Sequence, residues 1–154
     1  QLADIHEGDR VMIIGTGMGY SAAVVSHLAK EVVACESEAA FVTKAKEALK
    51  AFGIGNVQVE QLASLPEGSP KGAPYDVILI EGAVEIIPEK ISGMLAPGGR
   101  LVTVKRTPGA HGLAQGHGRL VLCTQLDGHV YCEEQREEFL PLLPGMAAPP
   151  RFIF

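Results

Sequence analysis

A short apolar run that leads directly into three alternating glycines limits the folds open to this chain more than any other stretch. Residues 11–14 are apolar on both faces and too short for a helix, which is typical of a strand buried in a parallel sheet. Gly15, Gly17 and Gly19 follow at once, and glycine permits positive φ and leaves no Cβ between the backbone and a ligand. A helix over residues 19–30 would direct free N–H groups towards that ligand. The stretch therefore predicts a strand, a ligand-binding turn and a helix.

The composition is that of a globular protein rather than a disordered one. The 154 residues are 47% hydrophobic and 20% charged, with a formal net charge of −5, so we expect one domain over residues 1–154. The sequence shows neither a basic patch nor an apolar run of membrane-spanning length. We expect a cytoplasmic protein with no nucleic-acid partner and no membrane contact, and we leave its oligomeric state open. Because the chain begins with Gln1 inside what resembles a helix end, we also expect that an N-terminal segment is missing.

The cysteines and histidines show no metal or redox pattern. Cys35, Cys123 and Cys132 lack CxxC spacing, and their odd number predicts reduced thiols. Cys35 lies in an apolar run, where a core position is the simplest interpretation. His111 and His117 alone are a weak basis for a metal site, so we expect no metal.

Strand-like and helix-like stretches alternate along the chain. Strands are expected at residues 11–14, 31–36, 56–60, 75–80 and 100–105, helices at 19–30, 38–52 and 86–95, and a hairpin at 119–125 and 129–137. We expect Ser37 to cap the second helix and the tail from Phe139 to Phe154 to be packed. The apolar stripe of that helix would consist of Phe41, Ala45, Ala48, Leu49 and Phe52. This order predicts a doubly wound α/β domain, with a mostly parallel Rossmann-like sheet and a C-terminal antiparallel hairpin. Its ligand would bind at the carboxyl ends of the strands.

Three features should meet at those strand ends. The first is the glycine turn. The second is Glu36, which ends the second strand and can accept the hydroxyl protons of a ribose, although it could instead cap the helix after it. The third is Glu81, which follows the fourth strand and would face a substrate, unless it is an ordinary solvated loop acid.

The glycine spacing separates two nucleoside cofactors. A nicotinamide site requires G-x-G-x-x-G, but the third glycine here comes one place early and Tyr20 occupies its slot. That bulky side chain would obstruct the close helix–strand contact, which disfavours a dehydrogenase. A G-x-G-x-G turn followed by an acid at the end of the second strand suits S-adenosylmethionine, which carries no phosphate.

Several motifs together resemble one methyltransferase family. Residues 14–23, IGTGMGYSAA, are similar to the first motif of the protein-L-isoaspartate O-methyltransferases, and residues 32–36, VVACE, to the second. Residues 74–78, 87–88, 95–102 and 139–143 follow in the family's order and spacing, so the resemblance covers nearly the whole chain.

The resemblance implies an S-adenosylmethionine-dependent enzyme that methylates isoaspartyl carboxylates for protein repair. Its partners would be isoaspartyl-containing proteins or peptides. A carboxylate is already ionised at pH 7, so no general base is needed and no catalytic residue is assigned. The cofactor contacts that it implies are Gly15, Thr16, Gly17, Gly19, Tyr20, Ser21, Glu36, Ser37, Leu62 and Glu81.

The chain also departs from the family pattern. Ile13 stands where the family has an acid, and residues 61–64, QLAS, lack the acid of its third motif. Residues 81–85, EGAVE, stand where the family usually has a threonine and a run of alanines, and the family's substrate-binding serine lies upstream of this chain. These departures indicate a divergent bacterial member. They leave a second hypothesis open, in which the chain is non-catalytic or differently specific and serves as a cofactor-binding or interaction module.

Overall fold

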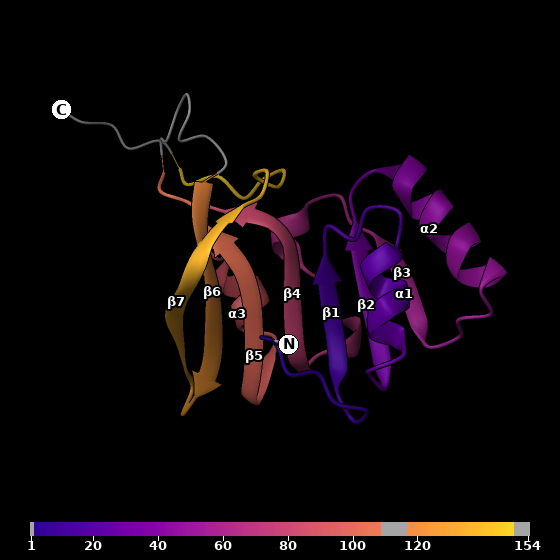
Figure 1. The fold of residues 1–154 in the computed structure, drawn as a ribbon, viewed down its shortest axis with the longest axis horizontal. Helices are drawn as coiled ribbons and strands as arrows, with labels where there is room; N and C mark the ends of the chain where they lie inside the picture. Colours follow the sequence, from indigo (N-terminus) through magenta and orange to yellow (C-terminus); the bar gives the residue numbers. More distant parts are fainter. Residues whose placement is uncertain (1, 109–116, 150–154) are drawn as a thin grey trace.

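The computed structural model describes residues 2–108 and 117–149, and its centre is a seven-stranded sheet (Figure 1). The strand order is β3-β2-β1-β4-β5-β6-β7. The first five strands in the chain are parallel, whereas β6 is antiparallel to both β5 and β7. This arrangement confirms the predicted α/β class with its antiparallel hairpin. The strands are β1 Arg10–Ile14, β2 Glu31–Glu36, β3 Val57–Gln61, β4 Tyr75–Val84, β5 Leu95–Lys105, β6 His117–Leu126 and β7 His129–Phe139.

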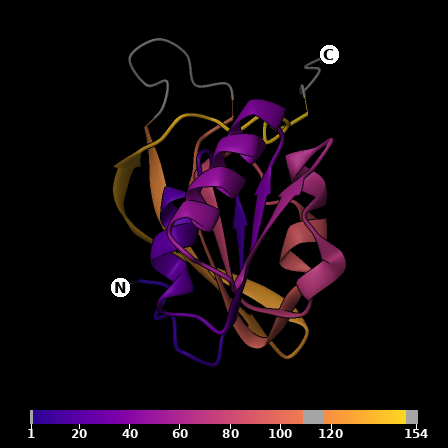
Figure 2. The same ribbon diagram turned by 90° about the vertical axis from the view of Figure 1, so that its right-hand side faces the viewer.

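Helical elements pack on both faces of the sheet and bury one apolar cluster on each (Figure 2). Helices α1, Tyr20–Ser26, and α2, Ala39–Ala51, cover one face. The 3-10 turns η1, Leu65–Glu67, and η2, Pro70–Gly72, lie on the other side with the short helix α3, Glu89–Ser92. The central strand β1 separates the two clusters, since alternate residues of a strand point to opposite faces. Residues Val11 to Ile14 are fully buried, as their unbroken apolar run predicts.

Long-range pairing moves several predicted boundaries. The first helix ends at Ser26 rather than at residue 30. The helix predicted over residues 86–95 shrinks to Glu89–Ser92, because Leu95 pairs with Tyr75 and starts β5 early. Strand β4 continues through Val84, so Glu81 lies inside a strand and not in a loop.

The apolar side of α2 agrees with the predicted stripe only in part. Ala45 and Leu49 are buried as predicted, whereas Phe41 and Phe52 are 41% and 78% exposed and Val42 is buried in their place. Apolar residues flank both sides of the stripe, so periodicity alone does not select the buried side. Contact with the sheet makes that selection.

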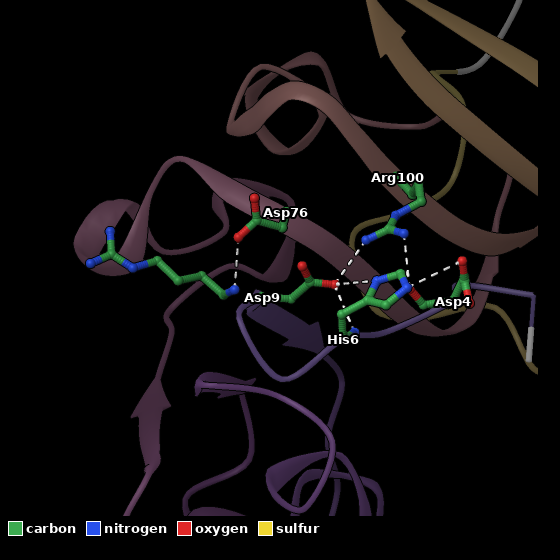
Figure 3. Close-up of polar contacts among 6 residues, drawn as sticks. Asp4, His6, Asp9, Asp76 and Arg100 are labelled. Carbon is green, nitrogen blue, oxygen red and sulfur yellow. Dashed lines mark hydrogen bonds and ion pairs between the residues drawn. The ribbon is translucent and has the colours of Figure 1, made fainter.

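A polar network at the amino end of the sheet holds the first residues of the chain against it (Figure 3). The Arg100 guanidinium contacts the Asp9 carboxylate at 2.8 Å and donates to the Asp4 carbonyl at 2.9 Å. The Arg10 N–H donates to Asp76 of β4 at 2.8 Å. This network lies at the opposite end of β1 from the glycine turn, so it supports the sheet without forming part of the candidate site.

The cysteines divide into one core residue and one pair. Cys35 is fully buried, and burial, followed by the charge of Glu60, raises the pKa of its thiol to about 12, so it stays neutral. Cys123 and Cys132 form a disulfide between β6 and β7, so the prediction of three reduced thiols is wrong for this pair. The residues are nine positions apart in the sequence, and only the hairpin register sets them opposite each other.

In the described part of the chain, no helix is both long and apolar enough to cross a membrane.

Candidate active site

The glycine turn adopts the backbone that its sequence predicts. Gly15, Gly17 and Gly19 have φ values of 79°, 55° and 85°, in the left-handed region that favours glycine. The N–H groups of Gly15 and Thr16 donate to the Cys35 carbonyl at 2.9 and 3.2 Å, which ties the turn to the end of β2. A Cβ on Gly19 would lie 3.0 Å from the Ala45 Cβ, whereas one on Gly17 would meet nothing within 4 Å. The turn is therefore packed on α2 at Gly19 and open at Gly17.

Glu36 closes the other side of the turn. Its Oε2 accepts a hydrogen bond from the Gly17 N–H at 2.8 Å, and its Oε1 accepts from the N–H groups of Ser37 and Glu38 at 2.7 and 3.1 Å. The side chain is only 6% exposed. The carboxylate thus joins the glycine turn to the backbone just before α2, and its role as an acceptor for ribose hydroxyls stays a prediction.

Thr16 provides an internal test of whether a polar ligand fits this turn. Its hydroxyl is buried, and within the described residues it has no hydrogen-bond partner. Buried polar atoms in native proteins are almost always paired, so this orphaned hydroxyl, one residue before the open position at Gly17, calls for a partner. The turn therefore fits a ligand that offers polar atoms to Thr16 and to the Gly17 backbone.

The other predicted cofactor contacts surround the turn unevenly. Tyr20 begins α1 with its side chain 82% exposed, so it does not obstruct the packing of the turn. Ser37 does not cap α2, whose N-cap is Glu38; its hydroxyl contacts Glu36 Oε1 at 3.3 Å instead. The Leu62 N–H donates to the Glu36 carbonyl at 2.8 Å, which brings the end of β3 to the same edge.

Glu81 lies on a bulge of β4 next to the turn. Leu79 pairs with Val102 and Ala83 with Val104, so residues 80–82 of β4 lie against Thr103 alone. Such bulges re-aim side chains and are common beside active sites. The Ser21 hydroxyl of α1 donates to Glu81 Oε2 at 2.6 Å. Burial raises the pKa of Glu81 above its ordinary value, and the hydrogen bond from Ser21 opposes part of that shift.

A cavity of about 330 Å³ adjoins Glu81 on the side away from β1. Most of its lining is apolar and comes from β4, β5, β6 and the segment after β7. The apolar lining includes Leu79, Val102, Val104, Leu120 and Leu140. The carboxyl ends of β1 and β4 therefore carry a polar turn on one side and an apolar cavity on the other, with Glu81 between them.

The segment after β7 crosses the carboxyl ends of the strands, and we call residues 140–148 the C-terminal strap (Figure 1). The Ala83 N–H donates to the Pro141 carbonyl at 2.7 Å, and the Leu143 N–H donates to the Ala83 carbonyl at 3.0 Å. Met146 is 1% exposed, which confirms the packing of the strap, whereas Phe139 at the start of the predicted tail is 60% exposed; residues 150–154 lie outside the described part. Leu143 was not predicted as a neighbour of the turn, although its Cδ2 lies 3.1 Å from where a Gly15 Cβ would be, and the glycine at position 82 was the available signal.

Gly82 is the position that admits the strap. A Cβ there would lie 2.3 Å from Leu143 Cγ and 2.7 Å from Leu143 Cδ2, so Gly82→Ala must displace that side chain. We expect the variant to lose about 1–3 kcal/mol of unfolding free energy, the usual cost of overpacking. Urea unfolding measures this loss. The double variant Gly82→Ala, Leu143→Ala removes the clash and should be more stable than Gly82→Ala alone; equal stability of the wild type and Gly82→Ala would contradict the packing.

Comparison with protein families shows which family this chain belongs to. Residues 1–115 match the family model described as protein-L-isoaspartate(D-aspartate) O-methyltransferase. The chain belongs to this family. The resemblance found in the motifs is thereby confirmed.

Curated members of the isoaspartyl methyltransferase family are similar over most of this chain. Protein-L-isoaspartate O-methyltransferase 1 of Rhodopseudomonas palustris (strain HaA2) is 42% identical over 141 residues, which cover 90% of this chain and 55% of that protein. The protein-L-isoaspartate O-methyltransferase of Synechococcus sp. (strain JA-2-3B'a(2-13)) is 36% identical, with coverages of 86% and 54%. The chain spans about half the length of the curated relatives it matches.

Solved structures agree on the fold. A protein-L-isoaspartate O-methyltransferase aligns with a TM-score of 0.81 at 26% identity, over 94% of this chain and 45% of that one. A putative protein-L-isoaspartate O-methyltransferase from Plasmodium falciparum, solved in complex with S-adenosyl-L-homocysteine, aligns with a TM-score of 0.67 at 16% identity. That match covers 90% of this chain and 66% of the other, and at this identity it shows the fold alone.

Proposed function

We propose that this chain binds S-adenosylmethionine at the glycine turn and transfers its methyl group to an isoaspartyl carboxylate, as a protein-repair methyltransferase. The observation that carries the cofactor proposal is the turn itself, with an orphaned Thr16 hydroxyl, open space above Gly17 and the Glu36 carboxylate bonded to its backbone. Membership of the isoaspartyl methyltransferase family supports the acceptor.

Each part of the turn has a role in this proposal. Glu36 would accept hydrogen bonds from the ribose hydroxyls, since it ends the second strand beside the turn. The Thr16 hydroxyl and the backbone of Gly15, Gly17 and Gly19 would meet the amino-acid end of the cofactor. Tyr20, Ser21, Ser37, Leu62 and Glu81 complete the proposed set of contacts. When bound, the cofactor supplies an electrophilic methyl group on a sulfonium.

The protein's contribution to the reaction is positioning. The acceptor carboxylate is ionised at neutral pH and needs no base, so the rate gain comes from holding the two reactants at attack distance. Well-oriented reactants can gain about 7–11 kcal/mol in this way. Isoaspartyl-containing proteins or peptides are the proposed partners. Residues 1–154 are proposed to form a single domain. A cytoplasmic location and the absence of nucleic-acid or membrane partners stay predictions.

Two measurements on the same protein test this function. Calorimetry should show binding of S-adenosylhomocysteine and none of NAD, because the turn lacks the nicotinamide spacing. Labelled S-adenosylmethionine should then transfer its methyl group to an isoaspartyl peptide and not to the same peptide with a normal aspartyl residue. A folded chain without affinity for S-adenosylhomocysteine would refute the cofactor proposal, and equal methylation of the two peptides would refute the acceptor.

A further inference from the structure

The Glu81 carboxyl has an oxygen that nothing in the described part of the chain uses. Ser21 donates to Oε2 at 2.6 Å, and within the described residues no hydrogen bond reaches Oε1. The bulge of β4 holds the residue at the carboxyl end of the sheet, partly buried beside the apolar cavity. One oxygen of the carboxyl is therefore oriented by the protein, and the other remains available to a ligand.

The position of Glu81 points to the methyl acceptor as that ligand. Strand β4 lies between β1, which carries the glycine turn, and β5, which lines the cavity. A cofactor over the turn would thus approach Glu81 from one side, and the cavity lies on the other. The cavity leaves space for a second reactant beside Glu81 on that side.

The surroundings of Glu81 favour its neutral form. Ser21 from α1 donates to it, and the described residues that line the cavity with it are uncharged; they are Leu79, Ile80, Val102, Thr103, Val104, Leu120 and Leu140. Burial raises the pKa of the Glu81 carboxyl. A second carboxylate brought beside it would raise that pKa further, because two carboxyl groups that share a site cannot easily both ionise. A protonated Glu81 would donate a hydrogen bond to that carboxylate, whereas an ionised one would repel it.

We propose that protonated Glu81 donates a hydrogen bond from Oε1 to the carboxylate of the methyl acceptor and so binds and positions it. This inference rests on the proposed isoaspartyl methyl transfer. The acceptor's other carboxylate oxygen forms the new C–O bond while the S–CH₃ bond breaks and its electron pair stays on sulfur. Glu81 keeps its proton throughout, so the products are a neutral ester and a thioether.

Peptide binding as a function of pH tests the proposal without any turnover. The protein is saturated with S-adenosylhomocysteine, and the affinity of a fluorescent isoaspartyl peptide is measured between about pH 5 and 9, where the peptide carboxylate is ionised. Wild-type affinity should fall as the pH rises through the raised pKa of Glu81. Glu81→Gln keeps an N–H donor that does not titrate, so its affinity should stay high and independent of pH. Glu81→Ala should bind roughly ten- to a hundredfold more weakly at low pH, since a hydrogen bond to a charged group is lost.

A control and a spectroscopic readout separate this role from a structural one. Glu47→Gln makes the same carboxyl-to-amide change on the exposed side of α2, away from the strand ends. This variant should reproduce the wild-type pH profile. In protein labelled with ¹³C-glutamate, the Glu81 carboxyl resonance, assigned by its absence in Glu81→Gln, should titrate at higher pH after the peptide is added. An unchanged titration would count against direct contact.

The outcomes distinguish the two proposals. Peptide binding that does not depend on pH, or Glu81→Gln that binds as weakly as Glu81→Ala, overturns the role of Glu81 and leaves the proposed function standing. Parallel loss of peptide and S-adenosylhomocysteine affinity in Glu81→Gln also overturns it, because Glu81 would then act on the peptide only through its contact with the cofactor. If S-adenosylhomocysteine binds but the isoaspartyl peptide binds to no variant, the proposed acceptor and the role of Glu81 both fail.

Discussion

Gly17→Val is expected to abolish S-adenosylhomocysteine binding while the domain stays folded. A Cβ at position 17 would meet no protein atom within 4 Å, so the new side chain fills only the space in which we propose the cofactor. The φ of 55° strains any residue other than glycine, and this should cost about 1–3 kcal/mol of unfolding free energy. We expect calorimetry to show an affinity more than about a hundredfold weaker, which is about 2.8 kcal/mol.

Gly53→Val is the matched control for this variant. Gly53 follows α2 with a φ of 67°, and a Cβ there also meets nothing within 4 Å, so the backbone strain is similar and the open space is alike. The residue lies in the loop that leads from α2 to the amino end of β3, away from the carboxyl ends of the strands. Gly53→Val should therefore lose similar stability and keep its affinity for S-adenosylhomocysteine. If Gly17→Val binds as well as Gly53→Val, no cofactor lies close to the turn.

Glu36→Ala should have the second-largest effect, because it removes groups needed by both the fold and the ligand. The part-buried N–H groups of Gly17, Ser37 and Glu38 would lose their acceptor, and each loss costs at most about 1–3 kcal/mol, the cost of a fully buried unsatisfied donor. Affinity for S-adenosylhomocysteine should fall by about 1.5–3 kcal/mol if Glu36 also accepts from the ribose. Urea unfolding and calorimetry measure the two losses separately.

Two further variants make this result interpretable. Glu36→Gln preserves size and one acceptor oxygen, so it should stay folded and still bind S-adenosylhomocysteine at least about tenfold more weakly, because one charged acceptor is lost. Glu31→Gln removes a carboxylate at the other end of β2, where Glu31 forms an exposed ion pair with Arg10 at 3.5 Å. It should leave the affinity unchanged and the stability nearly so. A change of less than twofold in Glu36→Gln would remove Glu36 from the cofactor site.

The glycine turn and Glu36 could be predicted from the sequence because their geometry is mostly local. Four consecutive apolar residues followed by alternating glycines leave few conformations open, since steric exclusion acts between near neighbours. Glu36 needed one further rule, that the carboxyl ends of adjacent parallel strands meet at one edge of the sheet. The register of β1 with β2, in which Ile14 pairs with Cys35, satisfies that rule.

Only the tertiary structure decided the second half of the candidate site. The bulge that aims Glu81 arises from unequal pairing of β4 and β5, and the partner of Glu81, Ser21, is 60 positions away in the sequence. The strap reaches Gly82 because Leu142, in the segment after β7, pairs with Ala83. Local composition does not encode such pairings, because they depend on which distant surfaces the sheet brings together.

The same distinction explains the predictions that were wrong. Periodicity indicated that α2 is amphipathic, but contact with the sheet decided that Val42 is buried and Phe41 exposed. Cysteine spacing gave no sign of a disulfide, because Cys123 and Cys132 are neighbours only across the β6–β7 ladder. By itself, the sequence determined the order of strands and helices, the glycine turn and the family, all of which rest on local sterics and hydrophobic patterning. Side-chain partners required the folded chain, because they are set by long-range packing and strand register.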